Sequence, residues 1–111
     1  MPLHVNGSVY KINGKQIKLY PIARLCAELE FIGYKRTPQS IRKWELHGVT
    51  PPAYFKIFRR RLYSLAQIKI FCDTVKECDI KQGYSLAMKD FSEKMWERLQ
   101  ELNSMYEGGI F

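Results

Sequence analysis

A short helix with a clear start and a clear stop, over about residues 38–47, constrains the fold of this chain most. Thr37 is a favourable N-cap, and Pro38 is a favourable first helical residue because its missing amide hydrogen would have no partner there. Gly48 suits the left-handed residue that ends a helix, and the two prolines that follow prevent its continuation. The helix is therefore expected to be short and sharply bounded.

The segment that follows, residues 53–63, predicts a two-stranded arm. Aromatic and β-branched residues are mixed with bases there, and the segment ends with three consecutive arginines before Leu62 and Tyr63. The sequence does not indicate where the turn of this arm lies. Ser64 and Gln67 match a capping box, which opens another helix that runs to about residue 78.

A β-hairpin is expected near the N-terminus, over residues 8–20. Asn13-Gly14 is a strong two-residue turn signal because both residues accept the positive φ of a type I′ turn. With that turn, Tyr10 pairs with Ile17.

Apolar residues at spacings of three and four predict one buried face on each helix. After Pro21, suited to a first turn, a helix over 22–30 buries Ile22, Leu25, Cys26 and Leu29, with Gly33 ending it. The helix over 38–47 buries Ile41, Trp44 and either Leu46 or the stem of Glu45, and the next buries Leu65, Ile68, Phe71, Cys72 and Val75. A last helix, over 85–106 and ended by Gly108-Gly109, carries Met88, Phe91, Met95, Leu99, Leu102 and Tyr106. This last stripe is buried either by folding back or by pairing with a second copy.

Positive charge is concentrated in residues 35–69, where nine basic residues accompany one acidic residue and give +8, against +7 for the whole chain. Such clustering favours a polyanionic partner. Three cysteines and two histidines show no metal-binding or disulfide spacing, and no phosphate-binding glycine loop or catalytic grouping occurs. We expect no metal, no cofactor and no enzymatic activity. No apolar run approaches the roughly 20 residues that span a bilayer, so a soluble cytoplasmic protein is expected.

The middle of the chain, residues 19–75, resembles the MerR-type winged helix-turn-helix DNA-binding domain. The family pattern is close to T-x-x-x-L/I-R-x-W/Y-E-x-x-G-L/V-x-x-P, followed by a wing that ends in R-x-Y and by a capped helix. Matching residues are Thr37, Ile41, Arg42, Trp44, Glu45, Gly48, Val49 and Pro52, then Arg61, Tyr63 and Ser64. Similar wings occur in phage excisionases and terminase small subunits.

The resemblance implies an α+β, mainly α, fold: a winged helix over residues 21–79, an N-terminal hairpin over 1–20 and an additional amphipathic helix over 84–107. It implies that the helix over 38–47 enters the major groove of DNA while the arm contacts phosphates. The DNA-binding residues would be Thr37, Gln39, Ser40, Arg42, Lys43, Tyr54, Lys56, Arg59, Arg60, Arg61 and Tyr63.

Two of these expectations have open alternatives, and Glu45 has a separate expected role. Successive strand residues point to opposite faces, so either Arg59 with Arg61, or Arg60 alone, would reach one phosphate track. Tyr63 would donate its hydroxyl to a phosphate or pack against the next helix. Glu45 would be a structural partner for a base such as Arg61, because a carboxylate facing phosphates costs binding energy.

These observations predict a small sequence-specific protein that binds double-stranded DNA, an effector-free transcriptional regulator of a bacterial cell, phage or mobile element. It would be nucleoid-associated, and it would form a homodimer if the last helix pairs with a second copy instead of folding back. An alternative is a DNA-processing or architectural factor that marks or bends DNA for a larger complex. A third alternative is a protein-interaction module, in which the last helix docks onto a partner enzyme.

Overall fold

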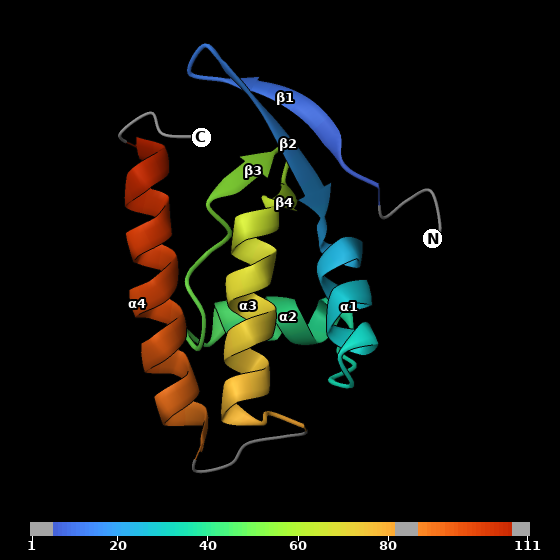
Figure 1. Ribbon diagram of the computed structural model, residues 1–111, viewed down its shortest axis with the longest axis vertical. Helices are drawn as coiled ribbons and strands as arrows, with labels where there is room; N and C mark the ends of the chain where they lie inside the picture. Colours follow the sequence, from blue (N-terminus) through green and yellow to red (C-terminus); the bar gives the residue numbers. More distant parts are fainter. Residues whose placement is uncertain (1–5, 82–86, 108–111) are drawn as a thin grey trace.

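The computed structural model describes residues 6–81 and 87–107, which form four helices and four strands (Figure 1). Their order is β1 (Ser8–Ile12), β2 (Lys15–Pro21), α1 (Ile22–Phe31), α2 (Pro38–Leu46), β3 (Phe55–Ile57), β4 (Arg60–Tyr63), α3 (Leu65–Cys78) and α4 (Ala87–Glu107). The expected α+β class is confirmed, and the helices hold more residues than the strands. Among these residues no helix combines the length and the apolar character that crossing a bilayer requires.

The N-terminal hairpin has the expected turn and register. Asn13 and Gly14 have φ values of 51° and 80°, and Tyr10 pairs with Ile17. The end of β2 then pairs with β4, where Tyr20 lies opposite Tyr63, and this pairing was not expected from the sequence. The result is one antiparallel sheet in the order β1-β2-β4-β3. The N-terminal hairpin is thereby joined to the basic arm by backbone hydrogen bonds.

Strands β3 and β4 form a second hairpin, residues 55–63, which we call the arginine hairpin. Ile57 pairs with Arg60, so the turn consists of Phe58 and Arg59 alone, with φ values of 51° and 65°. This is the same type I′ geometry as in the first hairpin, but built from two residues with large side chains. A left-handed backbone costs an ordinary L-residue roughly 1–2 kcal/mol, whereas Asn and Gly tolerate it. Because neither turn residue signals such a turn, its position could not be predicted.

The helix boundaries follow the expected caps closely. Thr37 Oγ1 accepts the Ser40 amide at 3.2 Å, and Ser64 and Gln67 form the complete capping box at the start of α3. Gly33 and Gly48 adopt the left-handed conformation just after α1 and α2, as expected. Pro21 is the N-cap of α1 rather than part of its first turn.

One of the expected apolar positions, Leu65, is wrong, and of the two alternatives in α2 the stem of Glu45 is largely buried whereas Leu46 is not. Leu65 and Leu46 are exposed, because the first lies in the opening turn of α3 and the second in the closing turn of α2, both away from the core. The polar residues Gln67 and Thr74 are buried in α3 instead. Their burial is compatible with hydrogen bonds: Gln67 bonds Asn103 of α4, and Thr74 bonds the Ile70 carbonyl.

Helix α4 folds back along α3, and the two run side by side in opposite directions (Figure 1). Phe91 and Met95 are fully buried, and the Phe91 ring lies 5.2 Å from that of Trp44. Trp96 donates to the Gly48 carbonyl at 2.9 Å. The apolar stripe of α4 is thus buried within one chain, as the fold-back alternative expects, and the homodimer stays a prediction. The expected start at residue 85 and the Gly108-Gly109 stop lie outside the described residues.

The buried side chains form two clusters, and each cluster contains residues from all three segments expected from the sequence, 1–20, 21–79 and 84–107. The larger cluster includes residues of all four described helices, among them Leu25, Trp44, Phe71 and Phe91. The smaller cluster joins the sheet to the end of α4 and consists of Leu19, Phe55, Leu62 and Tyr106. Helix α4 is thus part of the same core as the helices that precede it.

Replacing Phe91 with alanine is expected to reduce the free energy of unfolding by about 3–5 kcal/mol, because it opens a cavity beside Trp44. Phe31→Ala is the matched control, since the Phe31 side chain is 86 % exposed, and its effect is expected within about 0.5 kcal/mol. Urea unfolding of the two variants measures both values. Equal effects would contradict the packing of α4 onto the core.

Replacing Phe58 with asparagine is expected to stabilise the protein by about 1 kcal/mol, because asparagine tolerates the left-handed backbone and the Phe58 ring makes almost no contacts. The reciprocal change, Asn13→Phe in the first hairpin, is expected to destabilise by a similar amount. Thermal unfolding compares both variants with the wild type. A lower midpoint for Phe58→Asn would show that the turn is not strained.

Candidate nucleic-acid interface

A carboxylate on α2 holds the arginine hairpin in place. Glu45 Oε2 accepts from Arg61 Nε at 2.9 Å and Oε1 accepts from the other end of the same guanidinium at 3.3 Å, while Lys56 Nζ lies 3.4 Å away. The Ala53 amide donates to the same carboxylate. The expected pairing of Glu45 with Arg61 is confirmed. This contact fixes the distance between the helix and the hairpin.

Burial alone would raise the pKa of Glu45, but the hydrogen bonds and charges of Arg61 and Lys56 outweigh it. The pKa of Glu45 therefore lies below its ordinary value, and the carboxylate is ionised at neutral pH. The hydrogen bond to Glu45 likewise raises the pKa of Arg61. Glu45 thus offsets one of the two positive charges that it contacts on the hairpin, Lys56 and Arg61.

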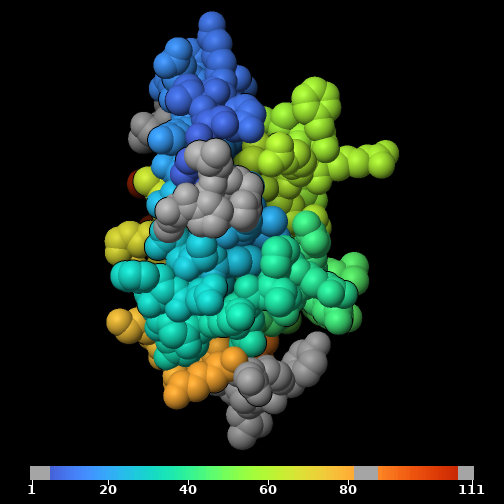
Figure 2. Space-filling model, turned by 90° about the vertical axis from the view of Figure 1, so that its right-hand side faces the viewer, coloured from blue at the N-terminus to red at the C-terminus, as the bar shows by residue number. Residues whose placement is uncertain are grey.

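A basic groove lies between α2, the arginine hairpin and the first turn of α1. It has a volume of about 360 Å³ and is lined by Pro21, Ile22, Ala23, Arg42, Arg59, Arg60 and Arg61. Figure 2 shows the yellow-green hairpin tip and the green end of α2 projecting on the same side of the molecule. Because Arg59 belongs to the turn and not to a strand, the alternation of strand residues does not exclude it from the groove. All three arginines therefore line one hollow.

The first turn of α1 adds to the positive potential of the groove. Its N-cap, Pro21, makes no side-chain hydrogen bond to the helix, and no acidic residue lies in the first turn. The opening amides of a helix have no intrahelical partner and carry a partial positive charge. Sequence reasoning missed this contribution, because it depends on which elements the fold brings next to α1.

The predicted residues of α2 divide into two groups. Thr37 and Ser40 are bonded to each other at the helix start, where their hydroxyl groups are 3.0 Å apart. Gln39, Arg42 and Lys43 are exposed, and their spacing places them on one face of the helix. This face, with the guanidinium of Arg42 beside the groove, is available to a ligand.

The nine basic residues of the 35–69 window are not equivalent. Four of them are bound within the chain: Lys56 and Arg61 to Glu45, Lys69 to Asp73, and Arg36 to the Ile80 carbonyl and the face of Trp44. Within the residues that the structure describes, the other five make no ion pair or hydrogen bond through their side chains: Lys35, Arg42, Lys43, Arg59 and Arg60. Four of these five come from α2 and the hairpin, so the unpaired charge is more localised than the sequence suggests.

Three predicted residues lie apart from the groove or are buried. Tyr54 packs edge-on against Phe55 and near Tyr106, and burial followed by the charge of Glu107 raises the pKa of its hydroxyl. Tyr63 is buried, and burial raises its pKa far above the ordinary value. Lys56 is half-exposed and paired with Glu45. The packing alternative for Tyr63 agrees with its burial.

The residue that sequence reasoning overlooked most clearly is Phe58. Its side chain is 93 % exposed at the tip of the hairpin, next to Arg59. Only the observed pairing of Phe55 with Leu62 leaves residues 58 and 59 for the turn, and that pairing is seen in the structure and not in the sequence. The amino-acid types at those positions gave no hint of it.

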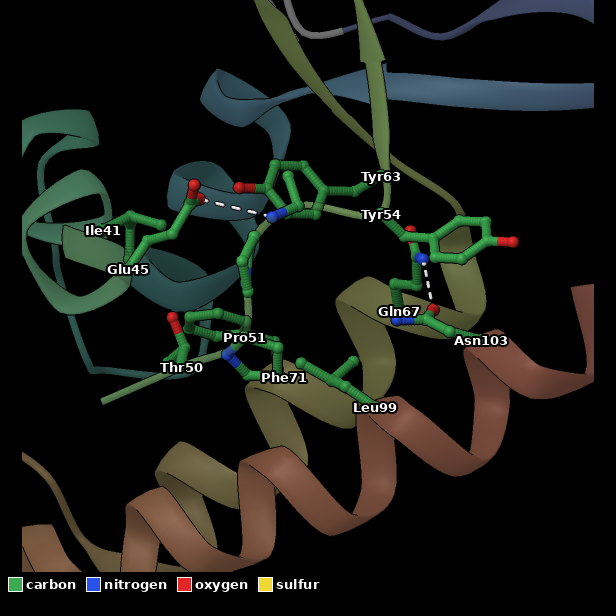
Figure 3. Close-up of a pocket in the computed structure, with 12 residues that line it drawn as sticks. Ile41, Glu45, Thr50, Pro51, Tyr54, Tyr63, Gln67, Phe71, Leu99 and Asn103 are labelled. Carbon is green, nitrogen blue, oxygen red and sulfur yellow. Dashed lines mark hydrogen bonds between the residues drawn. The ribbon is translucent and has the colours of Figure 1, made fainter. Parts of the chain in front are cut away.

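A small cavity lies between α2, the 50–54 segment, α3 and α4 (Figure 3), and its volume is about 20 Å³. Glu45, Tyr63, Gln67 and Asn103 bring polar groups to its walls. This volume is enough for about one water molecule, so it is too small for an organic ligand. The basic groove, at about 360 Å³ and lined by Arg42, Arg59 and Arg60 without ion pairs among the described residues, has the volume and the charge to receive part of a larger molecule.

Comparisons of this chain with protein-family models, with curated proteins and with solved structures give no match. The assignment of this surface therefore depends on its geometry and charge. The resemblance to MerR-type domains stays a prediction.

Protonation of Glu45 is expected to destabilise the fold at acid pH. A carboxylate with a depressed pKa stabilises the folded state above its unfolded pKa, ordinarily 4.5, and this contribution is lost as the pH falls through the folded value. Glu45→Gln should therefore reduce the free energy of unfolding by about 1–3 kcal/mol at neutral pH, and the difference from wild type should shrink below pH 4.5. Urea unfolding at several pH values measures this.

The control is Asp73→Asn, which removes an exposed ion pair with Lys69. Its effect is expected within about 0.5 kcal/mol at neutral pH. A Glu45→Gln difference that stays constant down to pH 3 would show that the carboxylate is not the group responsible.

Proposed function

We propose that this protein binds double-stranded DNA sequence-specifically through a winged helix-turn-helix formed by α1, α2, α3 and the arginine hairpin, and that it regulates transcription without an effector. The observation that carries this proposal is the basic groove. Arg42 from α2 and Arg59 and Arg60 from the hairpin line one hollow without a carboxylate partner among the described residues. Such a surface attracts a polyanion whose negative charges follow one another in a row, as phosphates do along a nucleic-acid backbone.

In this proposal the exposed face of α2 enters the major groove. Arg42 would donate two guanidinium N–H groups to guanine O6 and N7, and Gln39 and Lys43 flank it on the same face of α2. Arg59 and Arg60 would contact the adjacent phosphates. The first turn of α1 would support a phosphate near the groove, as helix N-termini do.

The charge of α4 agrees with this orientation. Residues 85–111 carry a net charge of −2, and Asp90 and Glu77 bind Lys94 and Arg98 on the side formed by α3 and α4. Acidic groups near phosphates would oppose binding. The duplex would therefore lie against α2 and the hairpin, with α4 turned away from it.

Selection of bound duplexes from a random pool tests the proposal. A defined consensus is the expected result, and one palindromic or single site supports a regulator. Several adjacent copies of a short site would favour the DNA-processing alternative. If no sequence is enriched and no duplex is retained above background, the proposal is refuted.

The affinity for the selected duplex is expected to fall with salt at a log–log slope of roughly −3, if Lys43, Arg59 and Arg60 each neutralise one phosphate. Arg60→Gln should reduce the magnitude of that slope by about 1 and weaken binding on all sequences alike. Arg42→Gln should cost about 1–3 kcal/mol and relax preference at one base pair, if it contacts a guanine. Fluorescence anisotropy titrations at several salt concentrations measure these effects.

Lys76→Gln is the matched control, because it also removes one positive charge but lies exposed in the last turn of α3. It should leave both the slope and the affinity close to those of the wild type. If the three variants weaken binding equally, the charge acts through the whole molecule and the groove has no special role.

A further inference from the structure

The tip of the arginine hairpin presents an isolated apolar side chain. Phe58 is the most exposed of the large apolar residues that the structure describes, at 93 %. It lies in a two-residue turn beyond the last strand pair, Ile57 with Arg60. Figure 2 shows this yellow-green tip projecting from the body of the molecule. The Phe58 ring therefore meets any ligand that the hairpin approaches.

The backbone of this turn is unfavourable for the residue that it holds. Phe58 and Arg59 both have positive φ, as Asn13 and Gly14 do in the first hairpin. The same chain thus makes the same turn twice, once with residues that accept it and once with residues that do not. Strained residues of this kind concentrate at binding sites, where the side chain matters more than the local backbone energy.

The surroundings of Phe58 restrict what its ring can bind. Arg59 is adjacent and exposed, Arg60 opens the returning strand, and Arg42 lies across the groove. A ligand for this tip must offer negative charge on either side of an apolar slot. Duplex DNA has this structure, because stacked base pairs lie between two tracks of phosphates.

From these observations we infer that Phe58 is a wedge that enters the duplex from the minor groove and partly separates one pair of stacked bases. The inference rests on the proposed DNA-binding function and specifies how the hairpin acts in it. Arg59 and Arg60 hold the phosphates on either side while the ring takes the place of lost base stacking. Inserted apolar side chains kink DNA by roughly 20–90° towards the major groove. This kink turns the duplex towards the face of α2.

The test uses the full-length protein and a duplex of about 30 base pairs with one central TA step, the kind of step that unstacks most easily. Donor and acceptor dyes at its ends report bending, and 2-aminopurine at the step reports unstacking. Wild-type protein is expected to shorten the end-to-end distance and to raise the 2-aminopurine emission. Phe58→Asn should abolish both signals while it keeps every arginine.

Phe58→Asn is informative because asparagine suits the turn, so loss of folding cannot explain a loss of bending. Phe58→Leu retains an apolar wedge and should keep most of the bend. Phe31→Asn is the matched control: Phe31 is also exposed but lies at the far end of α1 from the groove.

The outcomes separate the two proposals. If Phe58→Asn binds the duplex with unchanged bending and emission, the wedge is refuted and DNA binding stands. If Phe58→Asn and Phe31→Asn reduce the signals equally, the wedge is also refuted. If the wild-type protein binds neither this duplex nor any duplex from the random pool, both proposals fail.

Discussion

The contact between Glu45 and Arg61 determines what the rest of the surface can do. It joins α2 to the arginine hairpin through two hydrogen bonds, and the Ala53 amide ties the connecting segment to the same carboxylate. The hairpin is also held from the sheet side, by the pairing of β4 with β2 and by buried Phe55 and Leu62, and the Glu45–Arg61 contact adds a direct link to α2. One carboxylate thus orients the groove and at the same time removes one arginine from the set available to a ligand.

Helix α4 serves the same surface indirectly. Its Phe91 ring packs against Trp44 on the inner face of α2, and Trp96 bonds the carbonyl of Gly48 at the end of that helix. At its other end, Tyr106 bonds the Ser64 hydroxyl at 2.6 Å and packs on Phe55 of the hairpin. One helix therefore supports both α2 and the hairpin from behind. This arrangement leaves the opposite faces of both elements exposed.

Much of the fold could be predicted from residues whose effect is local. Thr37, Gly48, Ser64 and the Asn13-Gly14 turn specify caps and turns through bonds within a few residues, and the structure confirms each of them. What could not be predicted depends on contacts distant in sequence. The pairing of β2 with β4, the groove beside α1 and the choice between fold-back and dimer for α4 are of this kind.

For the candidate site, the sequence indicated where basic residues cluster but not which of them are bound within the chain. Nine basic residues look alike in a charge count, yet Arg36 and Arg61 are held in place by Trp44 and Glu45. That these two arginines are bound within the chain depends on where the Glu45 carboxylate and the Trp44 ring lie in three dimensions. Phe58 was missed for a different reason, since its turn contradicts the preferences by which turns are recognised.

The contacts that hold the arginine hairpin also keep its tip in a strained backbone conformation. A ring held on a short, braced hairpin loses little conformational freedom on binding, whereas the same ring on a loose loop would lose much of it. The bracing comes from buried Phe55 and Leu62 and from the bond of Arg61 to Glu45, which lie within a few residues of the turn. These contacts keep Phe58 in its unfavourable backbone conformation before any ligand arrives. The buried base of the hairpin thus supports an exposed apolar side chain at its tip, on the hairpin whose arginines line the groove with Arg42.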